Sequence, residues 1–417
     1  MTDDRDDPLQ GFRPRFALPR DASGQPLVYL CGHSLGLMPL AARQLVDEEL
    51  DSWAQRGIDG QFSGRRPWID YAGLLNEGLA NLAGAQPHEV VAMNSLTVNL
   101  HVLMASFYRP QGARRRILIE AGAFPSDRYA VAGQIGWHGL DPADCLVELA
   151  PRAGEDLLRA EDIDEAIGHA GETLALVLWP GVQYLTGQSF DLARIVRAAR
   201  RAGAAVGFDL AHAMGNVPLA LHDSGADFAA WCSYKYLNAG PGAIGGAFVH
   251  ERHQRRTDLP RLAGGWGTDP ATRFGMAAGF DCAGGAAGWQ TSNPPILSAA
   301  PLLASLEAFT AAGMPRLRAK SLALTRALEA CIDALPAGEA RILSPRDPAE
   351  RGAQLSVRVK GGRERSRRIF AALEARGIVC DWREPDVLRI APVPLYNRFD
   401  EVHACGRALR EALAQEP

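Results

Sequence analysis

The feature that most constrains the fold is an alternation of short apolar runs with helical segments through the middle of the chain. RRILIE (115–120) and LALVLWPG (174–181) are apolar runs of strand length, and FDLARIVRAARRAG (190–203) has the period of an amphipathic helix that ends on a glycine. Further strands are expected at 204–215, 227–237 and 243–250. Such alternation is typical of βαβ units, whose parallel sheet is buried on both faces. The pattern predicts an α/β fold with a mostly parallel sheet between helices.

The last third of the chain predicts a separate, smaller α+β domain. Its expected elements are a long helix at 296–335, a strand at 354–360, a helix at 365–377, a strand at 387–397 and a helix at 399–415. We therefore expect three parts: an N-terminal segment, 1–45, that packs with the small domain, a large domain, 46–295, and the small C-terminal domain, 296–417.

Charge and cysteine content exclude several classes of protein. The formal net charge is -4, so no overall positive field favours nucleic acid. The chain has no apolar run long enough for a membrane span, and its acidic N-terminus lacks the apolar core of a secretory signal. The seven cysteines are scattered without a CxxC pair, which favours the reducing cytoplasm over a disulfide framework. His250 and His253 are three residues apart, but we expect no metal site.

Lys235 is the sharpest candidate for chemistry. Polar residues follow predicted strands at 95–97, 124–127, 209–212 and 233–235, and ligands of open α/β sheets bind at the carboxyl ends of the strands. Lys235 ends the apolar run DFAAWCSYK and is one of three lysines in the chain. It is either a solvated strand-end residue or a partly desolvated amine, whose lowered pKa would make it a nucleophile toward aldehydes. His212 taken alone is more simply a core histidine.

Asp209 and Lys235 together favour pyridoxal 5'-phosphate as the cofactor. This cofactor needs a Schiff-base lysine and an acidic partner that keeps its ring nitrogen protonated. Its phosphate needs donors of the kind that a helix N-terminus supplies, and Leu96 and Thr97 are placed to do so. Phe124 could stack on the planar ring, although it could equally be an ordinary aromatic residue of a loop.

Seven motifs, in order along nearly the whole chain, match the pattern of one family. They are YLCGHSLGLMP (29–39), NSLTVNLHVLM (94–104), AFPSDRYA (123–130), GVQYLTGQSFD (181–191), VGFDLAHAMGNVPLALHDSGADFAAWCSYKYLNAGPG (206–242), GWQTSNPPIL (288–297) and RIAPVPLYN (389–397). With them the chain resembles the kynureninases, which are fold type I pyridoxal-phosphate enzymes. The resemblance implies a seven-stranded, mostly parallel sheet with a smaller C-terminal domain.

The resemblance implies a role for each residue of the cofactor site. Lys235 is implied as the Schiff-base lysine and proton acceptor, Asp209 as the partner of the ring nitrogen, and Tyr234 as a phosphate ligand and proton relay. The remaining implied cofactor contacts are Leu96, Thr97, Phe124, Ser126, Asp127, His212, Trp266 and Asn293.

The resemblance also implies the reaction, which is hydrolysis of the Cβ–Cγ bond of L-kynurenine or 3-hydroxykynurenine to (3-hydroxy)anthranilate and L-alanine. Such a reaction belongs to tryptophan catabolism or NAD biosynthesis. Arg389 is implied to grip the α-carboxylate of the substrate in bidentate fashion. The other implied substrate contacts are Asn293, Trp266, Gln61, Thr268 and Gly265, some of them supplied across a homodimer interface with shared active sites.

Three positions depart from the family's pattern. Where kynureninases usually carry Gly-Trp-Trp-Gly-His or Gly-Trp-Phe-Gly-His, this chain has Gly264-Gly265-Trp266-Gly267-Thr268, and Gln61 stands where a histidine is common. Changed polar groups in a pocket can discriminate strongly between substrates. A ring-substituted kynurenine or another γ-oxo-α-amino acid is therefore an alternative substrate.

Two other functions remain open on the residues. A cysteine desulfurase of the same fold type needs a mobile catalytic cysteine, and Cys282 lies in a glycine-rich loop. A non-catalytic protein that only binds the cofactor is the second alternative, although Asp209, Tyr234, Lys235 and Arg389 argue against it.

Overall fold

A seven-stranded sheet forms the centre of the larger part of the computed structural model, which describes residues 3–254, 256, 258–276 and 278–416. The strand order is β2 (Val90–Ala92), β8 (Gly246–Val249), β7 (Phe228–Trp231), β6 (Ala205–Asp209), β5 (Leu174–Pro180), β3 (Arg116–Glu120) and β4 (Leu146–Leu149). The ladders from β7 to β4 are parallel, whereas β8 is antiparallel to both of its neighbours. The prediction of a mostly parallel, seven-stranded sheet is confirmed.

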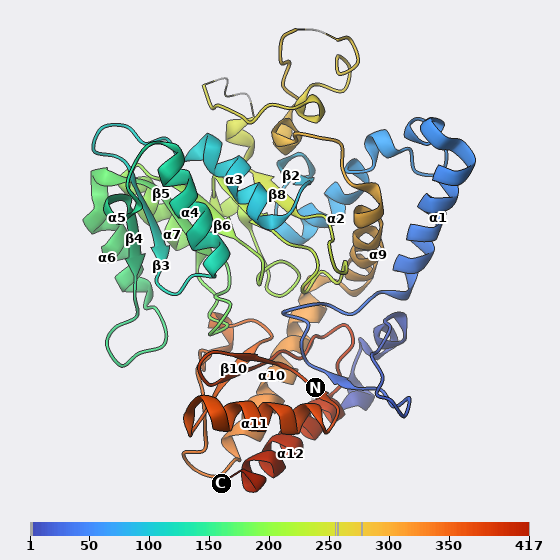
Figure 1. The fold of residues 1–417 in the computed structure, drawn as a ribbon, viewed down its shortest axis with the longest axis vertical. Coiled ribbons are helices and arrows are strands. Elements are labelled where there is room, and N and C mark those ends of the chain that lie inside the picture. The colour runs from blue at the N-terminus through green and yellow to red at the C-terminus, as the bar shows by residue number, and fades with distance from the viewer. Residues whose placement is uncertain (1–2, 255, 257, 277, 417) are drawn as a thin grey trace.

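Helices cover both faces of this sheet, as predicted (Figure 1). Alternate residues of one strand enter different cores: Ile117 and Ile119 of β3 pack with α3 (Leu96–Phe107) and α4 (Pro125–Trp137), whereas Leu118 belongs to the opposite core. That second core includes side chains of α6 (Ala160–Ala170), α7 (Leu192–Ala202), α1 (Leu40–Arg56), α2 (Gly73–Ala83) and α9 (Ile296–Ala312). Burial on both faces explains why the central strands are apolar throughout. The short helices α5 (Pro142–Cys145) and α8 (Leu221–Ser224) complete the larger part.

Two strand predictions need correction. The edge strand β4 was missed, because its half-buried sequence LVEL carries a charged residue and does not form an apolar run. The run 227–237 was predicted as one strand that Lys235 ends, but β7 ends at Trp231. There β7 pairs with Gly246 at the start of β8, and the following residues turn away from the sheet. Lys235 consequently lies in the loop beyond the strand.

The predicted long helix 296–335 is two helices, α9 and α10 (Met314–Asp333), which meet at an angle of 84°. Gly313 separates them with a φ of +77°, a conformation that L side chains rarely adopt and that glycine tolerates. Among the described residues no single helix is long and apolar enough to cross a membrane, and this bent pair meets that test only by combined length and composition.

The smaller part has a four-stranded antiparallel sheet in the order β12 (Asp381–Arg383), β13 (Val387–Ile390), β10 (Leu355–Val359) and β9 (Ala340–Ile342). α10, α11 (Gly362–Glu374) and α12 (Phe399–Gln415) share its core. The four elements expected over 354–415 are present in order, but the strand β12, between α11 and β13, was not predicted.

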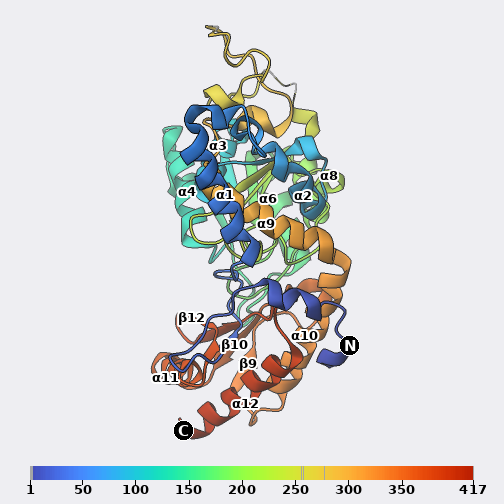
Figure 2. The same cartoon turned by 90° about the vertical axis from the view of Figure 1, so that its right-hand side faces the viewer.

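The N-terminal residues run beside this smaller part (Figure 2). The short strand β1 (Val28–Tyr29) pairs with β11 (Ile378–Val379) in parallel. The Nζ atom of Lys320 lies 2.7 Å from the carboxylate of Asp7, and both side chains are buried. These contacts agree with the proposed N-terminal segment, although the domain boundaries at 45 and 295 stay predictions, and the ends of the predicted ranges at residues 1 and 417 lie outside the described residues.

Candidate active site

A cavity of about 210 Å³ opens at the carboxyl end of the parallel strands, where ligands of such sheets bind. It collects nine of the residues singled out in the sequence, from four separate segments of the chain. They are Leu96, Thr97, Phe124, Ser126, Asp127, Asp209, His212, Tyr234 and Lys235; the other lining residues are Ser95, Glu120, Pro180, Val182, Tyr184 and Ala211.

The Lys235 amine has a specific neighbour in this cavity. Its Nζ atom lies 3.0 Å from Nε2 of His212. Burial, and then the positive charge of Lys235, lower the pKa of the His212 imidazole well below its usual value. The ring is therefore neutral, with Nε2 free to accept a hydrogen bond from the amine. His212 is both a core residue and a contact of the candidate nucleophile.

Three carboxyl groups share the cavity. Asp209 ends β6 and accepts the backbone N–H of Ala211 at 2.6 Å. Burial, together with the negative charge of Asp209, raises the pKa of Asp127 well above its usual value and that of Glu120 to about 8. Like charges crowded in a poorly solvated site cannot all stay ionised. Glu120 was missed in the sequence analysis, although it ends the buried strand RILIE.

Two helices begin at the cavity and form an anion cradle. Thr97 and Ser126 lie in the first turns of α3 and α4, and their hydroxyl oxygens are 2.7 Å apart. Ser95 precedes α3 without capping it through its side chain, so the first N–H groups of that helix are left for a ligand. The positive ends of two helix dipoles and two hydroxyl groups are a suitable set of donors for a phosphate.

Aromatic side chains flank the amine. The Phe124 ring is 41% exposed, and Lys235 Nζ lies 5.8 Å from its centroid and 5.9 Å from that of Tyr234. Tyr184, which the sequence analysis did not select, packs edge-on against Phe124 at 5.3 Å. A planar ring bound beside Lys235 would therefore find an exposed aromatic face.

Arg389 lies just behind this cavity and does not line it. Its Nη1 atom donates to the backbone oxygen of Tyr184 at 2.7 Å, and its guanidinium lies 6.0 Å from the Tyr184 ring. The side chain is 1% exposed and is paired with Asp381. Asp381 was not a candidate from the sequence, because local pattern does not show that it pairs with Arg389 across the β12–β13 hairpin.

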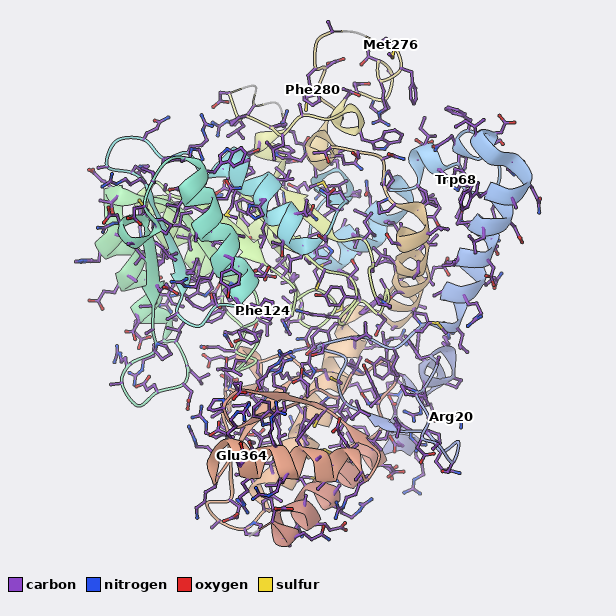
Figure 3. The ribbon with its side chains drawn as sticks, in the orientation of Figure 1. Arg20, Trp68, Phe124, Met276, Phe280 and Glu364 are labelled. Atoms are coloured by element: carbon purple, nitrogen blue, oxygen red, sulfur yellow. The ribbon has the colours of Figure 1, made fainter. Side chains whose placement is uncertain are left out.

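The other predicted substrate residues do not line the cavity of their own chain: Gln61, Gly265, Trp266, Thr268 and Asn293. Figure 3 shows Phe124 at the end of the larger part that faces the smaller part, and Met276 and Phe280 of the 264–282 loop at the opposite end. Within that loop Thr268 Oγ1 donates to the backbone oxygen of Gly265 at 2.6 Å. The Arg273 guanidinium lies over the Trp266 ring, 4.5 Å from its centroid. Within one chain, therefore, these five residues do not line the cavity that contains Lys235.

The Cys282 alternative finds little support in the geometry, and His250 and His253 do not share a carboxylate partner. Burial raises the pKa of the Cys282 thiol, and its sulfur lies 2.6 Å from Arg261 Nη1. A raised pKa disfavours the reactive thiolate. His250 and His253 contact different carboxylates: His253 Nε2 lies 2.7 Å from Asp227, and His250 is near Glu89.

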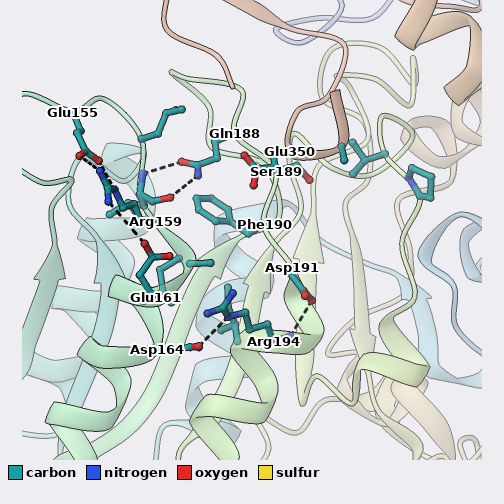
Figure 4. Close-up of a pocket in the computed structure, with 18 of the residues that line it drawn as sticks. Glu155, Arg159, Glu161, Asp164, Gln188, Ser189, Phe190, Asp191, Arg194 and Glu350 are labelled. Atoms are coloured by element: carbon teal, nitrogen blue, oxygen red, sulfur yellow. Dashed lines mark hydrogen bonds and ion pairs between the residues drawn. The ribbon is translucent and has the colours of Figure 1, made fainter. Parts of the chain in front are cut away.

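A larger cleft of about 970 Å³ lies at the starts of α6 and α7 (Figure 4). Arg194 is hydrogen-bonded to Asp164 at 2.9 Å, and Arg159 to Glu155. The described residues that line this cleft include no lysine, cysteine or histidine. Its described lining therefore has no amine that could form a Schiff base.

Comparison with known proteins gives consistent results. Residues 317–409 match the sequence model of the kynureninase C-terminal domain. A kynureninase of Xanthomonas campestris pv. campestris is 57% identical over 400 residues, and one of Stenotrophomonas maltophilia is 56% identical; each match covers 96% of this chain and 94% of the relative. The solved cysteine desulfurase CsdA of Escherichia coli has a TM-score of 0.79 at 20% identity, over 98% of this chain and 99% of that one. The apo cysteine desulfurase of Thermococcus onnurineus has a TM-score of 0.76 at 19% identity, over 93% and 95%. At these identities the two solved structures establish the fold alone.

Proposed function

The chain belongs to the kynureninase family, and we propose that it hydrolyses the Cβ–Cγ bond of L-kynurenine or 3-hydroxykynurenine to (3-hydroxy)anthranilate and L-alanine. The observation that carries the proposal is the Lys235 amine, 3.0 Å from a neutral His212, in a cavity that also contains Asp209. The desulfurase alternative is not favoured, because the desulfurase structures are only about 20% identical.

Pyridoxal 5'-phosphate fits the residues of this cavity. The exposed Phe124 face suits its ring, Asp209 its ring nitrogen, and the Thr97–Ser126 hydroxyl pair its phosphate. When bound, the cofactor supplies an electron sink for the charge left at the substrate's α-carbon. Ser126 and Asp127 come from the first turn of α4, so the helix that cradles the phosphate also fixes the Phe124 loop.

Lys235 and Tyr234 are the chain's proton carriers. His212 is neutral and can hold the amine by accepting its hydrogen bond, which orients Lys235 toward the cavity. Burial, with Cys232 nearby, raises the pKa of the Tyr234 hydroxyl, so this group keeps its proton and is a donor at neutral pH. In the proposed reaction water adds to the γ-carbonyl, the Cβ–Cγ bond breaks, and Cβ takes a proton to become the methyl group of alanine. Tyr234 is the group we assign to proton relay.

We also propose a homodimer whose partner supplies Gln61, Gly265, Trp266, Thr268 and Asn293. Exposed apolar side chains on α1 and the following loop support an interface, among them Trp53, Ile58 and Phe62, which are 61–74% exposed. Large exposed apolar groups that gather on a surface favour association. Lys235→Ala and Asn293→Ala should each be inactive alone, whereas mixed dimers should regain about a quarter of wild-type activity, because half of the dimers contain one intact site. No recovery after verified subunit exchange would argue against shared sites.

The altered aryl pocket remains a second candidate for specificity. A Cβ atom built on Gly265 meets no atom within 4 Å, so the missing side chain leaves open space. We propose kcat/KM measurements with kynurenine, 3-hydroxykynurenine and ring-substituted analogues. A clear preference for plain kynurenine would exclude the altered-substrate alternative.

The first experiment is to record the absorption spectrum of the purified protein in the near ultraviolet and visible, before and after L-kynurenine, with products identified. A cofactor band that borohydride removes, together with anthranilate and alanine, is expected. A cofactor band without products would retain the cofactor and overturn the kynurenine substrate. We propose further that the protein acts in the cytoplasm, in tryptophan breakdown or the supply of NAD precursors. All seven cysteines are free, which suits a reducing compartment.

A further inference from the structure

We propose that Asp381 is a positioning residue that presets Arg389 for the substrate's α-carboxylate, and that Ser34 and the Tyr184 carbonyl hold the place of that carboxylate until it arrives. The inference rests on the proposed function, because it takes the substrate to be an amino acid. It assigns a part in substrate recognition to Asp381 on β12 and to Ser34 in the N-terminal segment.

The hydrogen bonds of Arg389 show which edge of the guanidinium is committed. Nε donates to Asp381 Oδ1 at 2.7 Å, and Nη2 donates to Asp381 Oδ2. This is the bidentate arrangement that holds a guanidinium most firmly. Asp381 and Arg389 are direct cross-strand partners in the β12–β13 ladder, so the sheet itself fixes the register of the pair.

The other edge of the guanidinium, formed by Nη1 and Nη2, donates only to neutral acceptors. Nη2 donates to Ser34 Oγ at 3.0 Å and Nη1 to the Tyr184 backbone oxygen at 2.7 Å. Both acceptors are neutral, and a carboxylate is a stronger acceptor for a guanidinium than either. Ser34 keeps a partner after displacement, because its hydroxyl donates to Asp381 at 2.6 Å. An arriving carboxylate therefore exchanges neutral hydrogen bonds for ionic ones.

The charge of the cluster also favours an anion. Arg383 lies 3.2 Å from the same Asp381 carboxylate, and within the described residues neither arginine has another acidic partner. Two guanidinium groups therefore share one carboxylate. His33 adds no further positive charge: it is fully buried with Nε2 at 3.3 Å from Asp381, and burial followed by the Arg389 charge lowers its pKa to about 4. The cluster carries one excess positive charge at neutral pH, which one substrate carboxylate would neutralise.

The location matches a substrate group bound beside Lys235. Tyr184 lines the cavity and accepts from Arg389, so one residue separates the guanidinium from the cavity. The segment that carries Ser34 is tied to the lysine loop, since Gly36 donates its backbone N–H to the Tyr234 oxygen at 2.8 Å. These hydrogen bonds fix the positions of Arg389 and Ser34 relative to the lysine loop.

The test uses Asp381→Glu, which keeps the negative charge and hence a partner for the buried arginine, but lengthens the side chain by one methylene and displaces the guanidinium. The probes are L-alanine and L-alaninamide, which differ only in the carboxylate. Their binding to the cofactor-loaded protein is measured from the absorbance change and needs no turnover. Asp386→Asn is the control, because Asp386 lies in the turn of the same hairpin but pairs with Arg358 of β10, at 3.0 Å, and is 16% exposed, against 18% for Asp381.

Wild type should prefer alanine over alaninamide by about 100-fold, and Asp381→Glu should reduce that preference about tenfold, whereas Asp386→Asn should leave it within about twofold. With kynurenine, Asp381→Glu should raise KM more than it lowers kcat. An unchanged preference in Asp381→Glu, or an equal loss of affinity for both probes, would overturn the proposal, because a merely structural ion pair affects both probes alike. If Asp381→Glu shows the expected loss of preference but the wild type does not cleave kynurenine, the proposed function fails and the positioning role stands.

Discussion

Glu120 offers a prediction whose size follows directly from its surroundings. It ends β3 with 4% of its surface exposed, and no basic side chain among the described residues pairs with it. Burial, followed by the charge of Asp209, raises its pKa from 4.5 to about 8. We therefore expect Glu120→Gln, which has nearly the same shape and no ionisable proton, to stabilise the cofactor-free protein at alkaline pH.

The sign and magnitude follow from proton linkage. Between the unfolded pKa of 4.5 and the folded pKa of about 8, the folded chain retains a proton that the unfolded chain has lost. The stabilisation present below pH 4.5 is therefore lost as pH rises through 8. One pH unit corresponds to about 1.4 kcal/mol. From pH 6 to pH 8 the free energy of unfolding of wild type should fall by about 2 kcal/mol, because its pH dependence becomes less steep near the folded pKa. Glu120→Gln should not show this fall.

Equilibrium urea unfolding of the cofactor-free protein, followed by tryptophan fluorescence, would measure this difference at both pH values. Glu148→Gln is the control, because Glu148 lies beside Ile119 on the neighbouring strand but is exposed and paired with Arg128 at 3.0 Å. Its pH dependence should follow wild type. Parallel pH dependences for Glu120→Gln and wild type would refute the reasoning, since they would mean that Glu120 is ionised in the folded cavity.

Three further predictions concern single side chains. Lys235→Ala should lower kcat by about a thousandfold or more, because it removes both nucleophile and base, and borohydride should no longer attach the cofactor to the chain; a variant that retained the covalent adduct would place the reactive amine elsewhere. Thr97→Val should raise the dissociation constant of the cofactor about tenfold in equilibrium dialysis, since it removes a hydrogen bond to a charged phosphate, whereas Thr97→Ser should stay close to wild type. His33 has a folded pKa of about 4 against 6.5, so the unfolded chain binds the extra proton and wild type should lose about 3 kcal/mol as pH falls from 6.5 to 4. His33→Asn should remove that part of the acid sensitivity in urea unfolding, and an unchanged acid slope would show that His33 is protonated in the fold.

The sequence located the candidate cofactor cavity at one edge of the sheet. Leu96, Thr97, Phe124, Asp209 and Lys235 were all placed after buried strands, and the structure gathers them around one cavity. This succeeded because strand ends are visible as local patterns, and the carboxyl ends of parallel strands must meet at one edge of the sheet. The predicted end of the strand before Lys235 was less accurate, because a strand ends where its hydrogen-bonded neighbour does, and the position of that neighbour is not visible in local sequence.

Local sequence patterns did not predict which charged residues pair with each other or which of them are ionised. Asp381 and Arg389 are eight residues apart on antiparallel strands, while Ser34 reaches them from the other end of the chain. Nothing in the periodicity of the sequence distinguishes Asp381 from Asp386, yet Asp381 pairs with Arg389 of the same hairpin, whereas Asp386 pairs with Arg358 on the neighbouring strand β10. Desolvation and charge act through space, so they depend on neighbours that only the folded chain supplies.

By itself, the sequence determined the α/β class, the mostly parallel sheet and the candidate lysine, because apolar periodicity and chain order are sufficient to specify how βαβ units pack. Tertiary structure alone decided that the helix expected at 296–335 bends at Gly313. It also decided that Glu120 shares a cavity with two other carboxyls, and that Trp266 and Thr268 do not line the cavity of their own chain's lysine. The physical reason is that backbone periodicity is a property of neighbours in sequence, whereas burial, charge pairing and the composition of a site are properties of neighbours in space.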